Sequence, residues 1–430
     1  MLKILLILLT VFGFAEEIEV RLSTATPLKP MYIARFLPKE TESNLPLLTA
    51  LREVLVFDFN VGGFATVLPS RNEWEKEFDQ ALWKREKVPY VVAITATDNA
   101  LHATLFDIER STSKRYSNIP LTGQIAVDRK AMHALADQMQ GDVFGSQGIA
   151  SLRLIYSERK KQKNEWQSDL WIQDADGANR KQATLDHTYC ITPSFFPHTA
   201  GLKDPPFYFV SYKGGQSKIY AASLNKKPQP LIELRGNQLL PAMNAKATQM
   251  AFIGDAAGRA DLFLQTFDPQ GQAVGKSRQL YSAPRATQAS PTFSPDGKRV
   301  AFVSDKDGPP RIYWMDLEAK RARPQLITLK NRENISPAWS PDGKKLAFSA
   351  KSDGVRQIWI YDFETGEETA LTTGPENKEN PAWAPDNLHL AFNTDVNEEG
   401  QLFLIDLNAK KAVQISQGAG QKRFASWETR

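Results

Sequence analysis

A segment that recurs through the second half of the chain limits its possible folds more than any other feature. Three copies are unmistakable: SPTFSPDGKRVAFVSD from Ser290, SPAWSPDGKKLAFSAK from Ser336 and NPAWAPDNLHLAFNTD from Asn380. Two earlier segments, TPSFFP and LPAMNA, match the start of the same pattern. The shared proline recurs at spacings of 48, 50, 46 and 44 residues, at Pro193, Pro241, Pro291, Pro337 and Pro381. This period is typical of the blades of a β-propeller.

Each unit predicts four strands, and the chain holds six units. Behind the proline segment come an apolar run such as RVAFVSD, an aromatic run such as RIYWMD and a short run near Leu326. The first unit, residues 149–186, lacks a first strand, whereas FASW at residues 424–427 supplies only a first strand. We therefore expect an all-β, six-bladed propeller of WD40-like repeats over residues 148–430. The C-terminal strand would complete the first blade and leave no open sheet edge.

The repeated sequence Ser-Pro-Asp-Gly predicts a hairpin turn between the first and second strands. In residues 294–297, proline presets φ for the second turn position and glycine accepts the positive φ that follows. Asn387 replaces glycine in the last full copy, and asparagine also reaches the left-handed region. We expect Asp296 and Asp342 to be turn residues rather than acids or metal ligands.

The first fifteen residues, MLKILLILLTVFGFA, predict a secretory signal peptide. Lys3 precedes an apolar run, and small residues at Gly13 and Ala15 define a cleavage site between Ala15 and Glu16. The run is too short to span a bilayer, and no later stretch approaches the length of a transmembrane helix. The single cysteine, Cys190, rules out an internal disulfide. These features together predict a protein of the bacterial periplasm without a transmembrane span.

Residues 16–147 have a mixed pattern that predicts a small α/β domain. Strand-like alternation or β-branched runs occupy residues 17–22, 64–69, 88–97 and 101–109. Helical spacing occupies residues 46–59 and 127–140, and Gly141 follows the second of these segments. The fold class is therefore an α/β N-terminal domain followed by a six-bladed β-propeller.

The residues show no pattern that predicts catalysis. The nearest approach to a nucleophile elbow, residues 144–148, has Phe144 where glycine is required and follows a predicted helix instead of a strand. His187, Cys190 and His198 could be imagined as a metal cluster, but two loop histidines and a buried thiol are the favoured interpretation. The net charge of +4 is too balanced for a nucleic-acid-binding protein. We expect no enzyme activity, no cofactor, no metal and no nucleic-acid partner.

Propeller geometry indicates where a binding site would lie. The loop before each innermost strand opens onto the same mouth of the channel, so residues just before the repeat prolines should form a ring there. This ring is polar and largely uncharged, which suits a protein surface better than an anionic small molecule. The candidates are Asn237, Leu240, Ser290, Asn334, Ser336 and Asn380, with Thr192 in the corresponding place of the second unit.

These features resemble the TolB family of periplasmic propellers. The resemblance rests on the signal peptide, the small α/β domain, the segment DRKAMHALADQMQGDVFGSQG, the SPDGKKLAF repeats and DADGANRKQAT from Asp174, and it covers essentially the whole mature chain. It implies a monomeric, non-enzymatic scaffold of the Tol-Pal system that maintains outer-membrane integrity and supports constriction at cell division. A Pal-like peptidoglycan-associated lipoprotein would bind at the ring, and a TolA-like inner-membrane protein would bind the mature N-terminal segment, with candidates Glu19, Val20, Arg21 and Leu22.

Two alternatives remain open at this stage. A propeller hydrolase or lyase would use scattered carboxylates in the channel, with or without a bound calcium ion. A sensor propeller would bind a small ligand at the channel mouth. A pair of carboxylates lining the channel would favour the enzyme.

Overall fold

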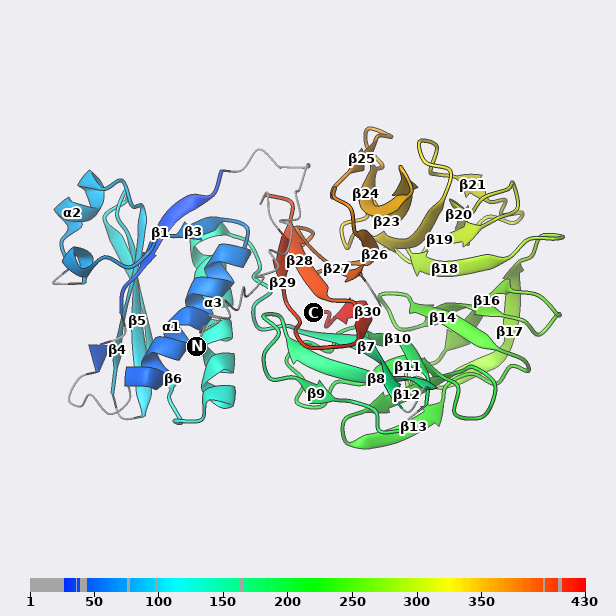
Figure 1. Cartoon of the computed structure of the whole chain (residues 1–430), viewed down its shortest axis with the longest axis horizontal. Coiled ribbons are helices and arrows are strands. Elements are labelled where there is room, and N and C mark those ends of the chain that lie inside the picture. Colours follow the sequence, from blue (N-terminus) through cyan, green and yellow to red (C-terminus); the bar gives the residue numbers. More distant parts are fainter. Residues whose placement is uncertain are drawn as a thin grey trace, which may run out of the picture.

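The computed structural model describes residues 27–35, 37–38, 45–75, 78–97, 99–162, 165–186, 188–396, 399–408 and 412–430. The expected signal peptide, its cleavage site between Ala15 and Glu16, and the expected TolA-binding residues 19–22 lie outside this part of the chain. Figure 1 shows an N-terminal α/β part, coloured blue to cyan, beside a ring of small sheets coloured green to red.

The N-terminal part is one mixed sheet with helices on both faces. Its strands follow the order β3-β1-β4-β5-β6, with β2 also paired to β4. Strand β1 runs parallel to β3 and β4, whereas β4, β5 and β6 are antiparallel. The strands are β1 (Lys29–Ile33), β2 (Leu37–Pro38), β3 (Ala65–Val67), β4 (Tyr90–Ala96), β5 (Ala100–Asp107) and β6 (Thr112–Pro120). The helices are α1 (Leu45–Val61), α2 (Gln80–Arg85), α3 (Ile125–Phe144) and a 3₁₀ turn at Asn72–Trp74.

Alternation along β1 explains why both faces of this sheet are covered. Met31 and Ile33 pack in the main core with residues of α1 and α3, whereas Tyr32 points to the other face and packs on Trp74 and Trp83. Helices α1 and α3 lie between the sheet and the propeller, as Figure 1 shows. The expected α/β domain is confirmed, although α2, β1, β2 and β6 had no clear signal in the sequence.

Six four-stranded antiparallel sheets form the propeller and confirm the expected fold. The first sheet joins β30 (Gln421–Trp427) to β7 (Arg153–Gln162), β8 (Glu165–Asp174) and β9 (Lys181–Gln182). The second sheet consists of β10 (Cys190–Phe195), β11 (Phe207–Ser211), β12 (Lys218–Ser223) and β13 (Lys226–Pro230). The third consists of β14 (Gln238–Met243), β15 (Gln249–Gly254), β16 (Asp261–Phe267) and β17 (Ala273–Tyr281). The fourth consists of β18 (Gln288–Phe293), β19 (Arg299–Ser304), β20 (Arg311–Asp316) and β21 (Gln325–Leu326). The fifth consists of β22 (Asn334–Trp339), β23 (Lys345–Ser352), β24 (Val355–Asp362) and β25 (Glu368–Ala370). The sixth is β26 (Asn377–Trp383), β27 (His389–Asp395), β28 (Leu402–Asp406) and β29 (Ala412–Gln414).

The second strand of every blade is buried on both faces, which explains its continuous apolar sequence. One aromatic ring per blade occupies the same place in this strand and is fully buried against a neighbouring blade. These rings belong to Tyr156, Phe209, Phe252, Phe302, Phe348 and Phe392. The turns behind the first strands have the expected conformation, with φ of 73° at Gly297, 75° at Gly343 and 60° at Asn387.

The two ends of the propeller sequence meet in the first blade. Strand β30 pairs antiparallel with β7, from Gln421 opposite Arg159 to Trp427 opposite Leu154. Beyond the last pair, the buried Glu428 carboxylate accepts hydrogen bonds of 3.0 Å from the backbone N–H and Nε of Arg153. The side chain of Trp427 is buried, and its Nε1–H donates to the Ala382 carbonyl of the preceding blade at 3.2 Å.

We predict that Trp427→Ala lowers the free energy of unfolding by about 3–5 kcal/mol, because it removes a core ring at the point where the circle of blades closes. Leu329→Ala is the control, since Leu329 is 72% exposed and its truncation should change stability by less than about 0.5 kcal/mol. Urea unfolding followed by circular dichroism measures both values. Equal effects of the two substitutions would contradict this role of β30.

Candidate functional site in the propeller channel

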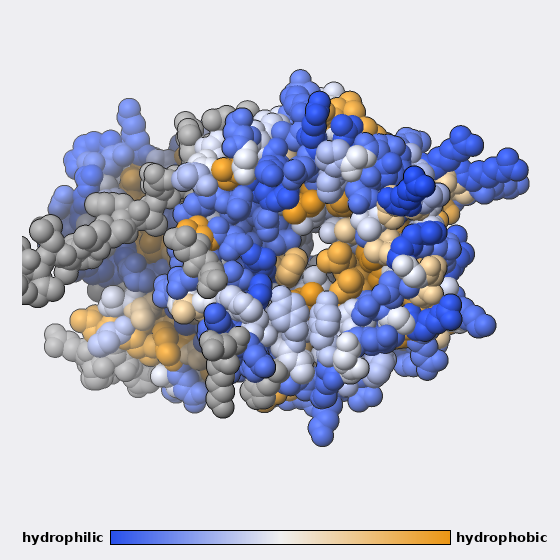
Figure 2. All heavy atoms as spheres, turned by 45° about the vertical axis from the view of Figure 1, so that its right-hand side comes forward, coloured by the Kyte–Doolittle hydropathy of each residue, from blue (hydrophilic) through white to orange (hydrophobic). Residues whose placement is uncertain are grey.

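A cavity of about 310 Å³ lies on the axis of the propeller and is lined by residues from all six innermost strands. Figure 2 shows this region as a hole through the ring, with apolar residues on part of its wall. Each innermost strand contributes one non-glycine residue with positive φ to the lining. These residues, which we term the channel ring, are Thr192 (48°), Leu240 (51°), Ser290 (45°), Ser336 (51°), Asn380 (53°) and Phe424 (57°).

A bulge in the sheet produces the unusual backbone of the channel ring. In every blade the pairing between the first and second strands shifts register at the ring residue and the one that follows it. Five of these following residues are the repeat prolines, which have no N–H for the ladder and so fit at a bulge. The repeat proline in the sequence therefore marks a bulge, and this bulge turns the side chain before the proline toward the channel. The ring residues lie within the strands, and the expectation that they belong to the preceding loops is wrong.

The structure brings four of the six predicted ring candidates together in the cavity: Leu240, Ser290, Ser336 and Asn380. Asn237 and Asn334 are not among the lining residues. Asn237 lies at the end of the preceding loop, where its backbone N–H and Nδ2 donate to the Asp255 carboxylate. Asn334 is fully buried at the start of β22 and donates from Nδ2 to the Asn331 carbonyl. Both asparagines hold loops beside the mouth through these hydrogen bonds.

Sequence reasoning missed Phe424 as a member of the channel ring. Its unit has Ala425 in place of the repeat proline, so the pattern that identified the other members is absent there. The alignment of FASW with the other first strands was the available signal, because it places Phe424 directly before the proline position.

The channel ring carries hydrogen-bonding groups but no ionisable side chain. Ser336 Oγ donates to Asn380 Oδ1 at 3.0 Å, and Asn380 Nδ2 donates to Asn393 Oδ1 at 2.9 Å. The Thr192 hydroxyl is buried without a hydrogen-bond partner among the described residues. Of the described residues that line this cavity, none is Asp, Glu, Lys, Arg or His. A neutral ligand surface therefore fits this part of the channel better than a charged one.

A second and more apolar chamber of about 440 Å³ continues the channel toward the hairpin turns. It shares Ser194, Tyr208, Met243 and Phe293 with the first cavity. Three indole rings form part of its wall, and their Nε1–H groups each donate to a backbone carbonyl at 3.1–3.2 Å, which fixes the ring orientations. They belong to Trp339, Trp383 and Trp427.

The two mouths of the channel have different surroundings. Each innermost strand begins at a loop on one side and ends at a hairpin turn on the other. The turn side of the sixth blade contacts the end of α1, where His389 Nε2–H donates to the Val61 carbonyl at 2.5 Å. Asn408, in a neighbouring turn, donates from Nδ2 to the Gly63 carbonyl at 2.7 Å. The N-terminal domain is therefore attached at the turn side, and the loop side points away from these contacts.

Paired charges surround the loop-side mouth. Arg356 Nη2 lies 3.3 Å from a Glu333 carboxylate oxygen, and Arg356 Nε lies 3.3 Å from Glu379. Arg423 pairs with Asp395 on the adjoining blade edge. An uncharged centre within a charged rim is the usual composition of a protein-binding surface.

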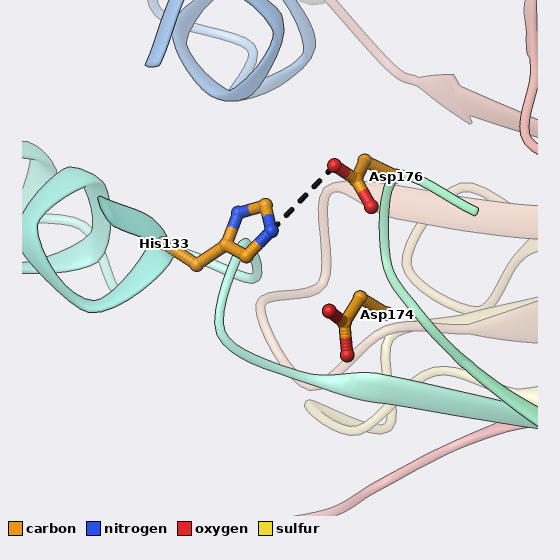
Figure 3. Close-up of side chains that lie close together, drawn as sticks. All are labelled: His133, Asp174 and Asp176. Carbon is orange, nitrogen blue, oxygen red and sulfur yellow. Dashed lines mark ion pairs between the residues drawn. The ribbon is translucent and has the colours of Figure 1, made fainter. Parts of the chain in front are cut away.

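One group of possible metal ligands, His133, Asp174 and Asp176, occurs within the described ranges, and it lies at the domain junction away from the channel. Figure 3 shows the three side chains converging: His133 from α3, Asp174 from the end of β8 and Asp176 from the turn behind it. Arg129 already forms an ion pair with Asp176, and Asn179 Nδ2 donates to Asp174 at 2.6 Å. Protein donors therefore occupy both carboxylates. Among the described residues, no helix combines the length and apolar character needed to cross a membrane.

The fold and channel define a six-bladed propeller protein with an uncharged cavity on its axis and an α/β domain at one side. A family model described as the TolB β-propeller domain matches residues 142–430. The chain is 41% identical over 384 residues to a TolB homologue of Protochlamydia amoebophila, a match that covers 85% of this chain and 82% of the relative. It is 33% identical to a homologue of Chlamydia trachomatis serovar D, over 85% and 80% of the two chains. This protein belongs to the TolB family.

The crystal structure of TolB from Acinetobacter baumannii has the same fold. It superposes with a TM-score of 0.77 at 21% identity, over 96% of this chain and 100% of that one. At this identity the match supports the fold alone.

We predict that Thr192→Asn raises the free energy of unfolding by about 1 kcal/mol, because asparagine tolerates the left-handed backbone better than a β-branched residue. Asn380 already occupies the equivalent position in the sixth blade. Thr292→Asn is the control, since Thr292 lines the same cavity but lacks a positive φ. Urea unfolding measures the stability of both variants. If Thr192→Asn is destabilised as much as Thr292→Asn, the positive φ at residue 192 does not favour asparagine and the prediction is contradicted.

Proposed function

We propose that this protein is the TolB-type scaffold of a Tol-Pal system and acts in the periplasm without catalysing a reaction. It binds a Pal-like peptidoglycan-associated lipoprotein at the loop-side mouth of the channel. Its mature N-terminal segment, including residues 19–22, binds a TolA-like inner-membrane protein. Through both contacts it maintains outer-membrane integrity and supports envelope constriction during cell division. Membership of the TolB family supports the system, and the structure supports the place of the first contact.

The channel ring is the observation that carries the assignment of the Pal site. Six bulges, one per blade, expose neutral side chains and backbone on the channel axis. Residues with positive φ cost free energy and persist where surrounding structure holds them, a feature that concentrates at ligand-binding positions. The mouth beside this ring faces away from the contacts with α1 and is surrounded by paired charges. A folded partner can therefore approach the ring without displacing the N-terminal domain.

The neutral lining favours a scaffold over the hydrolase or lyase alternative. General acid–base catalysis needs titratable side chains within reach of the reacting atoms. The described residues around the channel ring include no carboxylate, imidazole or ammonium group, and the second chamber adds His198 and Arg430 but no Asp or Glu. This composition supports binding of a protein surface through neutral hydrogen bonds and apolar contacts.

We predict that Ser290→Arg combined with Asn380→Arg weakens binding of the Pal-like partner at least 100-fold, because two bulky charges would fill the neutral cavity. Isothermal titration calorimetry with the purified partner domain measures the dissociation constant. Thermal unfolding should stay within a few degrees of the parent protein. Unchanged affinity in a folded double variant would exclude the ring as the Pal site.

Lys320→Glu provides a control for the general effect of charge. Lys320 is exposed on the loop between β20 and β21, on the turn side of the fourth blade, and does not line either chamber. We expect this substitution to leave the affinity for the Pal-like partner unchanged. A loss equal to that of the double variant would show that binding responds to charge at a distance.

We further predict that removal of residues 16–26 from the mature protein abolishes binding of the TolA-like partner and leaves binding of the Pal-like partner intact or tighter. The deletion ends before β1 and so retains every described strand of the N-terminal sheet. Pull-down with each partner domain separates the two contacts. Retention of the TolA-like partner would show that its site lies elsewhere on the protein.

A further inference from the structure

Two buried histidines connect the N-terminal domain to the propeller, and each domain contributes one. His389 begins β27 in the sixth blade and reaches the carbonyl of Val61, the last residue of α1. His133 lies in the middle of α3 and faces the turn behind β8 in the first blade. Both side chains are almost completely shielded from solvent. The proposed contacts with Pal and TolA use neither residue.

Both ring nitrogens of His389 face an oxygen atom that can only accept a hydrogen bond. Nδ1 lies 2.5 Å from Asp386 Oδ2, and Nε2 lies 2.5 Å from the Val61 carbonyl oxygen. A neutral imidazole carries a single N–H and would direct a lone pair at one of these oxygens. The ring must therefore carry two protons to satisfy both contacts. Its positive charge also lies at the C-terminal end of α1, where the helix dipole favours a cation.

Charge balance around His133 leads to the same protonation state. Its Nδ1 lies 2.8 and 3.0 Å from the two carboxylate oxygens of Asp58 on α1. Its Nε2 is directed at Asp176 of the propeller, at 3.5 Å, as Figure 3 shows. Asp174 is the third buried carboxylate of this cluster, and Arg129 is the cation that already pairs with Asp176. Buried carboxylates require compensating charge, and a protonated His133 supplies it between α1 and the first blade.

We infer that His133 and His389 are both imidazolium ions and form a proton-dependent lock that holds α1 and α3 against the propeller. Without its second proton, His389 cannot donate to both of its acceptor oxygens. Without its charge, His133 no longer compensates the buried carboxylates of Asp58 and Asp176. The lock is therefore closed near neutral pH and weakens under alkaline conditions. It adds pH control over domain docking to a protein whose channel ring is itself uncharged.

The charged groups around both rings support this direction. Burial alone would lower the pKa of His389, but Asp386, Asp406 and the Val61 carbonyl outweigh it and raise that pKa to about 9. Burial likewise opposes the charge on His133, whereas Asp58, Asp176 and Asp174 raise its pKa. Arg129 and Asp137 are further charged groups of α3 near this cluster, and burial raises the pKa of Asp58 to about 6.

The sign of the pH dependence follows for His389. Because its pKa in the folded protein lies above the ordinary value of 6.5, the stabilisation is complete below pH 6.5 and is lost as the pH rises through about 9. Docking should be tightest near neutral pH, because Asp58, the partner of His133, becomes protonated below about pH 6. A tenfold or greater loss of docking is expected between pH 7 and pH 10.

The charge state is tested first in the unmodified full-length protein. Carbon-13 labelling of histidine side chains gives five signals to titrate by NMR. We expect the His389 and His133 rings to remain charged at pH 7.5, when ordinary exposed histidines are neutral. A neutral ring at either position at this pH overturns the proposal.

Amide hydrogen exchange then tests the lock itself. The protection factor of the last turn of α1, referred to that of β23, should fall at least tenfold from pH 7 to pH 10. His389→Gln, whose amide can donate to Val61 at any pH, should remove most of this pH step, while His102→Gln in the N-terminal sheet should retain it. The same step in His389→Gln, or no step in the parent protein, would contradict a lock that depends on His389. If His389→Gln does not fold, the NMR titration of the parent protein still decides.

Discussion

Pairing of β30 with β7 is the interaction on which the rest of the structure depends. It joins the last residues of the chain to the beginning of the propeller, with Trp427 opposite Leu154 and Glu428 bound to Arg153. Without this pairing the first blade lacks its innermost strand, and only five innermost strands line the channel. The axial cavity, its ring of six bulges and the junction with the N-terminal domain all require a closed circle of blades.

In the closed circle, an innermost strand can contribute to the channel ring and also lead into a turn that contacts the N-terminal domain. In the sixth blade, β26 contributes Asn380 to the channel ring, and the turn that follows carries Asp386 and His389 to the end of α1. The bulge explains how one strand provides both, because it turns a neutral side chain into the channel while the rest of the strand keeps its pairing. The loop-side mouth remains available to a partner, and the turn side holds the N-terminal domain.

Local signals predicted the blades well, because the turns and apolar runs of each repeat act over a few residues. The same repeat identified Leu240, Ser290, Ser336 and Asn380, but a bulge within a strand cannot be distinguished from a loop residue by sequence alone. Asn237 and Asn334 were chosen because the ring was expected in the loops before the strands, and neither lines the cavity. Phe424 was missed because Ala425 replaces the repeat proline. The domain junction had no sequence signal at all. Its contacts join residues as distant as Val61 and His389, and only the folded chain brings them together.

Amide hydrogen exchange with and without a saturating Pal-like partner domain tests the central claim most directly, because it maps the contact over the whole protein. The account predicts new protection at the loop side of the propeller, at the start of β14, β18, β22 and β26, with none at the outermost strands. Protection confined to the N-terminal domain, or to the turn side of the blades, would contradict the assignment of the Pal site to the channel ring.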